Sequence, residues 1–160
     1  MSSQLEASRP VIPQDVLLNH WQGHRRLTRR VIDAFPEDQL NTFSVGGMRP
    51  FGTLVLELLS MAEPSLHGIV TGDWPMDMNR DPQPKAELLK RWDASTKRID
   101  ALWPQIPPGR LEEHMVAFGQ YPGRGYELLL YIIDNEVHHR GQGYVYLRAL
   151  GIEPPPFWER

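Results

Sequence analysis

The last part of the chain, residues 126–151, reads YELLLYIIDNEVHHRGQGYVYLRALG. Its apolar residues recur at steps of three and four, the spacing of one face of an α-helix, so the stretch predicts one long helix. One stripe of this helix carries, in order, Leu128, Ile132, Asn135, His139, Gln142, Tyr146 and Ala149. Three polar side chains therefore share a face with core residues. Each needs a partner, because burying such a group unpaired costs about 1–3 kcal/mol.

The rest of the chain predicts three more amphipathic helices. We place them at residues 13–34, 51–70 and 85–103, separated by segments rich in proline and glycine. No segment has a convincing strand pattern, although residues 115–118 favour a short extended piece that covers one end of the core. Four helices around one core predict an all-α fold, a four-helix bundle, in a single domain spanning residues 1–160.

The composition limits the classes of function. The chain has 17 Lys and Arg against 20 Asp and Glu, and so lacks the excess positive charge of a nucleic-acid-binding surface. It has no cysteine, which excludes disulfides, thiolate ligands and a cysteine nucleophile. The longest apolar run, Leu128–Ile133, is far shorter than the roughly 18 residues of a membrane span. The first residues lack a signal-peptide pattern. We expect a cytoplasmic protein with no nucleic-acid or membrane partner.

The inward polar residues leave two interpretations open. Glu57 lies in an apolar run of the second expected helix, while Asn135 and His139 lie one turn apart on the last one. Side chains at i and i+4 can reach one ion, and imidazole with carboxylate and amide oxygens suits Zn, Ni or Mn. The alternative is a polar cluster without metal, in which Glu57 is hydrogen-bonded to His139 or Asn135.

Neighbouring residues are candidates for orienting groups around this site. His24, on the inward stripe of the first helix, either approaches Glu57 or remains a core histidine. On the last helix, the candidates that flank His139 are His138, Arg140 and Gln142.

Two further features concern packing. The arginines of the first helix are expected on its solvated face: Arg25, Arg26, Arg29 and Arg30. Gly141 and Gly143 each cost a helix about 1 kcal/mol relative to alanine, which indicates close approach of another helix within the bundle or across a dimer.

The stretch NEVHHRGQ, residues 135–142, resembles the last-helix signature of the DinB/YfiT-like superfamily, whose usual form is H-E-x-H-H-R-G-Q. The resemblance continues in YVYLRALGIEPPP and EPPPFW at the end, in WQGHRRL of the first helix, and in VGGMRPFGTLVLELLSMAE across the loop and second helix. It implies a four-helix bundle with a long crossover connection, commonly dimeric, and a divalent-metal site of three histidines. It also implies that some members are thiol S-transferases acting with bacillithiol or mycothiol, or isomerases that use such thiols.

By position, the three histidine ligands that the resemblance implies fall on Glu57, Asn135 and His139, so only one remains a histidine. Both replacements retain oxygen atoms that can coordinate an ion. The resemblance therefore predicts a DinB-like, divalent-metal-dependent thiol S-transferase with an altered site, a small-molecule thiol or electrophilic substrate, and a homodimer. The alternative is a metal-free, non-catalytic binding or stress-response protein with the same bundle.

Overall fold

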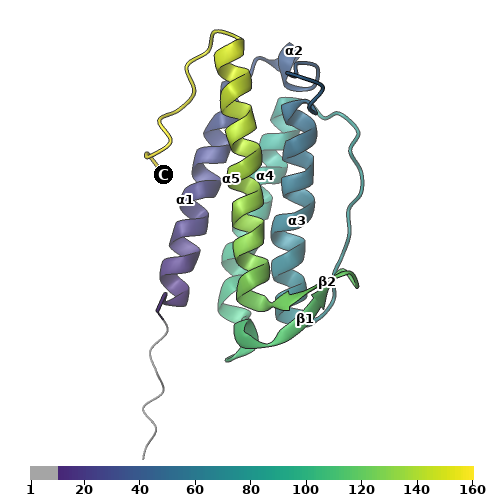
Figure 1. Ribbon diagram of the computed structural model, residues 1–160, viewed down its shortest axis with the longest axis vertical. Helices are drawn as coiled ribbons and strands as arrows, with labels where there is room; N and C mark the ends of the chain where they lie inside the picture. Colours follow the sequence, from purple (N-terminus) through teal and green to yellow (C-terminus); the bar gives the residue numbers. More distant parts are fainter. Residues whose placement is uncertain (1–10) are drawn as a thin grey trace, which may run out of the picture.

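The computed structural model describes residues 11–160, and within them the chain forms four long helices (Figure 1). These are α1 (Gln14–Ala34), α3 (Phe51–Thr71), α4 (Lys85–Leu102) and α5 (Gly125–Ala149). A short helix, α2 (Glu37–Leu40), follows α1, and two 3-10 turns, Trp103–Gln105 and Arg110–Glu112, follow α4. The predicted bundle is confirmed, and each predicted helix boundary lies within one or two residues of the observed one.

Proline sets the start of the first three long helices. Pro13, Pro50 and Pro84 each stand immediately before a helix, where the fixed φ of proline suits the turn and its missing N–H removes no hydrogen bond. The last long helix begins differently: the Glu127 carboxylate accepts a hydrogen bond from the backbone N–H of Arg124 at 2.7 Å. These local signals explain why the helix positions are readable from the sequence.

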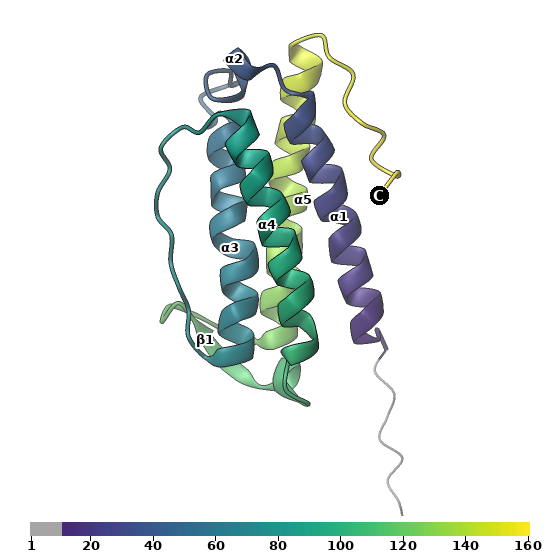
Figure 2. The same ribbon diagram turned by 180° about the vertical axis from the view of Figure 1, so that it is seen from behind.

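The connection between α3 and α4 runs along the outside of the bundle. The helices α1 and α5 point one way and α3 and α4 the other, so the connector, residues 72–84, travels the length of the bundle (Figures 1 and 2). This is the long crossover that the resemblance implies. The ring of Trp74 covers Gly68 on α3 so closely that a side chain at Gly68 would overlap it. The beginning of the connector is therefore fixed against α3.

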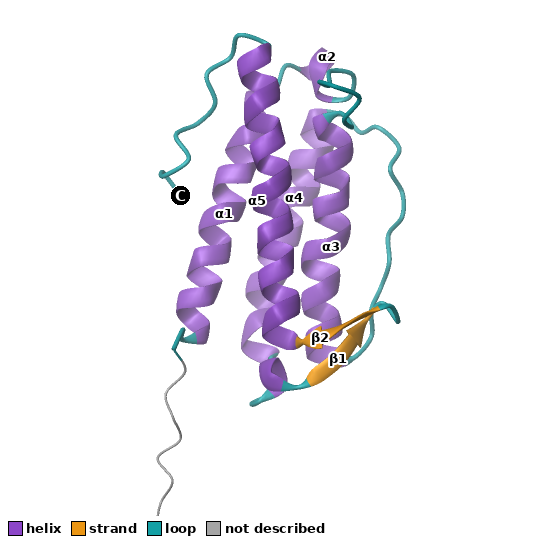
Figure 3. Cartoon of the chain, in the orientation of Figure 1, coloured by secondary structure: helices purple, strands orange, loops and turns teal. Residues whose placement is uncertain are grey.

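A small antiparallel hairpin closes the end of the bundle where α5 begins (Figure 3). Its strands are β1 (His114–Ala117) and β2 (Tyr121–Arg124). The predicted extended piece is right for the first strand. It is wrong for Phe118, which lies in the turn with a φ of 53°. The second strand was not predicted, because YPGR has no apolar alternation.

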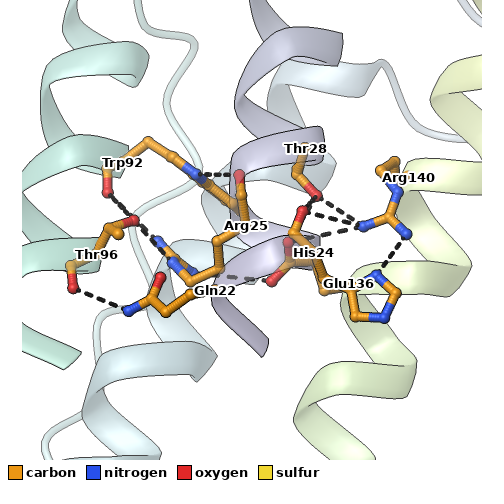
Figure 4. A network of polar contacts seen from close by, with 8 residues as sticks. All are labelled: Gln22, His24, Arg25, Thr28, Trp92, Thr96, Glu136 and Arg140. Atoms are coloured by element: carbon orange, nitrogen blue, oxygen red, sulfur yellow. Dashed lines mark hydrogen bonds and ion pairs between the residues drawn. The ribbon is translucent and has the colours of Figure 1, made fainter. Parts of the chain in front are cut away.

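The core consists of two apolar clusters stacked along the bundle axis. One contains Phe35, Phe51, Trp92 and Tyr146 near the α2 end, and the other contains Trp21, Trp103 and their neighbours near the hairpin. Polar side chains from α1, α4 and α5 face one another inside the bundle (Figure 4), and along each of these helices they lie between residues of the two clusters. Along the bundle axis, the interior therefore has an apolar layer, then a polar layer, then a second apolar layer.

Candidate functional site

The structure brings two of the three predicted metal ligands into direct contact. The Oε1 atom of Glu57 on α3 lies 3.0 Å from Nε2 of His139 on α5. The other ring nitrogen, Nδ1, lies 2.8 Å from Oε1 of Gln142, one turn further along α5. His139 is buried, whereas the Glu57 side chain is 21% exposed. Gln142 therefore orients the ring of His139, and Glu57 is the more accessible member of the pair.

Arg49, in the loop before α3, is a member of this site that the sequence analysis missed. It forms an ion pair with the second carboxylate oxygen of Glu57. Its own carbonyl accepts a hydrogen bond from the Tyr146 hydroxyl at 2.9 Å, which anchors the loop to α5. Arg49 is the only basic residue of the loop NTFSVGGMRP, residues 41–50, and this position directly before the helix of Glu57 is the sequence feature that could have indicated the ion pair.

The charge of Glu57 depends on its two partners. Burial raises the pKa of the Glu57 carboxyl, but hydrogen bonds from Arg49 and His139 outweigh it and bring the pKa below its ordinary value. The carboxyl is therefore ionised at neutral pH. We call this set, Arg49, Glu57, His139 and Gln142, the Glu57 cluster.

Asn135, the third predicted ligand, is near this cluster but not in hydrogen-bond contact with it. Its amide nitrogen lies 3.3 Å from the sulfur of Met61 on α3. The contacts Glu57–His139 and Met61–Asn135 thus occupy successive turns of the antiparallel helices α3 and α5. Among residues 11–160, the carbonyl oxygen of Asn135 has no hydrogen-bond partner. That oxygen remains able to act as a ligand.

The donor atoms fit a divalent ion in part. Two ligand atoms held on one ion at about 2.0–2.2 Å lie roughly 3.0–3.5 Å apart, which matches the separation of Glu57 and His139. The carbonyl contact on Nδ1 is the kind of outer hydrogen bond that orients a metal-binding histidine. The third donor is a neutral amide, however, and Arg49 already neutralises the carboxylate. Residues 11–160 contain no cluster of three His, Asp or Glu side chains arranged to hold a metal. The set therefore supplies two close donors, Glu57 and His139, and a neutral amide outside hydrogen-bond contact with them.

A cavity of about 630 Å³ opens beside Glu57. It lies between α3, α5, the connector and the turn of the hairpin, and most of its lining is apolar. Prominent side chains of this lining are Met61, Met76, Met78, Phe118, Leu128 and Ile132. Its volume falls in the range of sites for small organic ligands, roughly 300–1,000 Å³. Glu57 belongs to the lining and His139 does not, so a bound molecule meets the carboxylate first.

A second polar cluster, the central polar network, crosses the middle of the bundle. It consists of Gln22, His24, Arg25, Thr28, Trp92, Thr96, Glu136 and Arg140 (Figure 4). The Glu136 carboxylate, 1% exposed, accepts a hydrogen bond from the Thr28 hydroxyl at 2.6 Å. It lies 3.8 Å from a guanidinium nitrogen of Arg25 and 3.9 Å from one of Arg140. Burial raises the pKa of the Glu136 carboxyl against the opposing effect of these cations.

Arg25 is buried, so its predicted solvation is wrong. Its side chain is 0% exposed and donates hydrogen bonds to the Thr96 hydroxyl at 2.9 Å and the Trp92 carbonyl at 3.3 Å. The guanidinium also lies 4.1 Å from the centre of the Trp92 ring, within the range of a cation–π contact. Polar partners on α4 therefore make burial of this arginine possible.

The structure places the other predicted residues away from Glu57. Nδ1 of His24 lies 2.9 Å from a guanidinium nitrogen of Arg140, so both belong to the central polar network. Burial, with the charge of Arg140, lowers the pKa of His24 to about 4, and its ring is neutral at pH 7. His138 is exposed beside His139. Of these four candidates, only Gln142 forms a hydrogen bond with a residue of the Glu57 cluster.

Sequence reasoning also missed Glu136, because the buried face of α5 is rotated slightly from the predicted stripe. Asn135 and Gln142 are half-buried at its edge, and Ala149 is exposed. The buried residues of α5 are Gly125, Leu129, Ile132, Ile133, Glu136, His139, Arg140, Gly143, Tyr146 and Leu147. The spacing of Glu136 and Arg140, an acid and a base one turn apart within an apolar pattern, is the signal that indicates a buried pair.

The sequence profile of the DinB family matches residues 1–160. The chain belongs to the DinB family. It is 22% identical to the YjoA protein of Bacillus subtilis (strain 168) over 147 residues, 90% of this chain and 95% of that protein. The membership explains the bundle and the HHRGQ segment.

Solved structures agree with this DinB-like fold. The crystal structure of the DinB-like protein YjoA from Bacillus subtilis superposes with a TM-score of 0.71 at 20% identity, covering 90% of this chain and 99% of that one. The mycothiol-dependent maleylpyruvate isomerase gives a TM-score of 0.64 at 14% identity, covering 82% of this chain and 61% of that one. Within residues 11–160, no helix is long and apolar enough to cross a bilayer.

Proposed function

We propose that this DinB family chain is an enzyme of the thiol S-transferase type. It joins a small-molecule thiol to an electrophilic substrate, and the substrate lies in the cavity beside the Glu57 cluster. The observation that carries the proposal is the contact between Glu57 and His139 at the edge of that cavity. The structural similarity to an isomerase that depends on mycothiol supports a thiol as cosubstrate. The lack of cysteine in the chain agrees with a sulfur nucleophile that arrives from outside.

The residues that would hold a divalent ion, Zn, Ni or Mn, are Glu57, His139 and Asn135. Such an ion supplies the positive charge that stabilises a thiolate and so lowers the pKa of the thiol. Glu57 faces the cavity and carries the negative charge of the site, while Gln142 keeps the ring of His139 in place. Asn135 contributes a neutral oxygen only, so we expect weaker binding than at three histidines. A small intracellular thiol as cosubstrate favours a cytoplasmic location.

The ion pair between Arg49 and Glu57 favours a second candidate, a metal-free, non-catalytic binding or stress-response protein. The guanidinium neutralises Glu57, and both ring nitrogens of His139 already face oxygen atoms. Each ring nitrogen of His139 therefore has a polar partner, so the contacts of the cluster are complete without an ion. The cavity would then serve binding alone.

Metal titration separates the two candidates. Protein purified without an affinity tag is titrated with Zn²⁺, Ni²⁺ and Mn²⁺ by calorimetry, and its thermal unfolding is compared with and without chelator. The enzyme requires binding of one ion per chain, lost in Glu57→Gln and His139→Gln and strengthened in Arg49→Gln, which frees a carboxylate oxygen. His138→Gln, an exposed neighbour, is the matched control and binds normally. If no ion binds stoichiometrically and chelator leaves the Tm unchanged, the transferase proposal is wrong.

We also propose a homodimer that packs through the outer face of α5. Leu130, Val137 and Val145 are 44%, 39% and 53% exposed and recur at helical spacing. A Cβ at Gly141, between them, would meet nothing within 4 Å, so a second helix has room to approach. Light scattering after gel filtration is the test: the protein runs as a dimer and Val137→Glu as a monomer. A monomeric wild-type protein at about 100 µM would contradict this proposal.

A further inference from the structure

The cavity beside Glu57 has one basic residue in its lining among the residues that the structure describes. That residue is Arg80, on the connector between α3 and α4, and its side chain is half-buried. One guanidinium nitrogen donates to the carbonyl oxygens of Asp77 and Asn79, each at 3.0 Å. The other donates to the Ser60 hydroxyl on α3 at 2.9 Å. Three neutral acceptors thus hold the cation at the cavity wall.

No carboxylate within residues 11–160 forms an ion pair with Arg80, although three acidic residues share the cavity lining. Each acid has a partner of its own. Glu57 is held by Arg49 and His139. The Asp77 carboxylate lies 3.2 Å from a guanidinium nitrogen of Arg91, and the Glu127 carboxylate accepts the backbone N–H at the start of α5. Within the described part of the chain, Arg80 is therefore a cation of the lining that no carboxylate pairs with, just as Glu127 is an acid of the lining that no cation pairs with.

A fixed cation beside an apolar wall favours a particular kind of ligand. The wall removes part of the water that would solvate the guanidinium, so an incoming anion gains more there than it would in open solvent. Hydrogen bonds in which both partners are charged are also stronger than neutral ones. Because three contacts already fix the guanidinium, binding does not have to order it. The apolar side chains opposite, with Met61, Leu128 and Ile132 among them, suit a hydrocarbon or aromatic body.

We infer that the cavity binds an amphipathic organic carboxylate, with its carboxylate on the guanidinium of Arg80 and its apolar body between α3 and α5. The body then extends toward Glu57, where the proposed chemistry takes place. This inference names the substrate class of the proposed function and rests on it only in calling the ligand a substrate.

The test compares three probes with the same apolar body and different heads: 4-phenylbutyrate, 4-phenylbutan-1-ol and 4-phenylbutylamine. Binding is followed by NMR of protein labelled with ¹³C in the methionine methyl groups, without added metal. Met61, Met76 and Met78 line the cavity, while Met48 and Met115 do not and serve as internal controls. We expect the carboxylate to bind with a Kd of about 1 mM, at least about tenfold tighter than the alcohol, and to shift the three lining methyl signals. The amine is expected to bind more weakly than the alcohol.

The Arg80→Gln variant tests whether Arg80 causes the preference for the carboxylate probe. It removes the positive charge but keeps amide N–H groups that can donate to Ser60. It is expected to bind the carboxylate no better than the alcohol, while Arg148→Gln, an exposed arginine at the far end of α5, retains the preference. If Arg80→Gln does not fold, Arg80→Lys and added NaCl replace it: lysine keeps the preference, and salt weakens only the carboxylate.

Four results would overturn the inference. The first is equal or tighter binding of the alcohol or the amine, and the second is a set of shifts at Met48 or Met115 instead of the lining methionines. The third is no binding of any probe at 20 mM, a concentration about twentyfold above the expected Kd, and the fourth is a preference for the carboxylate that survives in folded Arg80→Gln. Because the probe-binding experiment uses no metal, its result does not depend on whether the metal titration succeeds. The result of the metal titration likewise does not depend on probe binding.

Discussion

Replacing Glu136 by glutamine tests whether the central polar network contains a true buried charge pair. The substitution keeps the size of the side chain and an oxygen that accepts the Thr28 hydroxyl, but it removes the negative charge. Within residues 11–160, Glu136 is the acid at ion-pair distance from the buried Arg25 and Arg140. The variant therefore leaves two buried guanidinium groups without a counter-charge.

The expected loss follows from this geometry. Breaking a buried ion pair by removing one partner costs about 3–5 kcal/mol. The lower end applies here, because the two distances, 3.8 and 3.9 Å, are longer than hydrogen bonds and burial raises the pKa of the Glu136 carboxyl. We expect the free energy of unfolding at pH 7 to fall by about 3 kcal/mol, a drop in Tm of roughly 6–12 °C for a chain of this size.

Urea unfolding, followed by circular dichroism and tryptophan fluorescence, measures this change. The matched control is Asp134→Asn, an exposed acid on the same helix, which should change the free energy of unfolding by less than about 0.5 kcal/mol. In the double variant with Arg140→Gln, part of the loss should be recovered, because one of the two unpaired cations is gone. A loss below about 1 kcal/mol for Glu136→Gln would show that the carboxyl is protonated in the folded protein and that no charge pair exists.

Three further predictions concern pH and packing. Folding lowers the pKa of the Glu57 carboxyl, so the wild-type protein should have a larger free energy of unfolding than Glu57→Gln above about pH 4.5. This difference should disappear as the pH falls below that value. Urea titrations from pH 7 to 3 test this, and a constant difference would refute it. Folding lowers the pKa of His24 from 6.5 to about 4, so unfolding takes up a proton and the free energy of unfolding decreases as the pH falls from 6.5 to 4. His24→Gln should lose less of its free energy of unfolding over this pH range, and equal slopes for the two proteins would count against the prediction. Gly143→Ala places a Cβ 2.5 Å from the Phe51 ring and should lower the free energy of unfolding by about 1–3 kcal/mol. Gly141→Ala meets no atom of its own chain within residues 11–160 and should raise the free energy of unfolding of the monomer by up to about 1 kcal/mol. Thermal unfolding of both variants in the monomeric Val137→Glu background decides, and equal effects would contradict the packing.

Local signals made most of the fold predictable. Prolines 13, 50 and 84 begin helices, Gly72 with a φ of 82° ends α3, and the 3.6-residue period marks each inward face. The second strand of the hairpin has no such signal. Its pairing depends on the turn at residues 118–119 and on contact with the bundle, neither of which is local to YPGR.

The site was predictable where a single helix face decided it. Glu57 and His139 were placed together because a charged group in an apolar run needs a partner on a facing helix, and the structure joins them. Arg49 escaped prediction because its position depends on a hydrogen bond to Tyr146, 97 residues further along the chain. Arg25 and Glu136 escaped because each looks solvent-exposed until the other helix is in place.

The central polar network also bears on how the helices align. Leucine and isoleucine pack against one another almost equally well after a helix slides along its neighbour. If α1 slid by one turn, about 5.4 Å, Arg25 would lose Thr96 and Glu136 together and face apolar residues instead. The central polar network thus favours one alignment of α1 against its neighbours, whereas apolar packing alone would allow several.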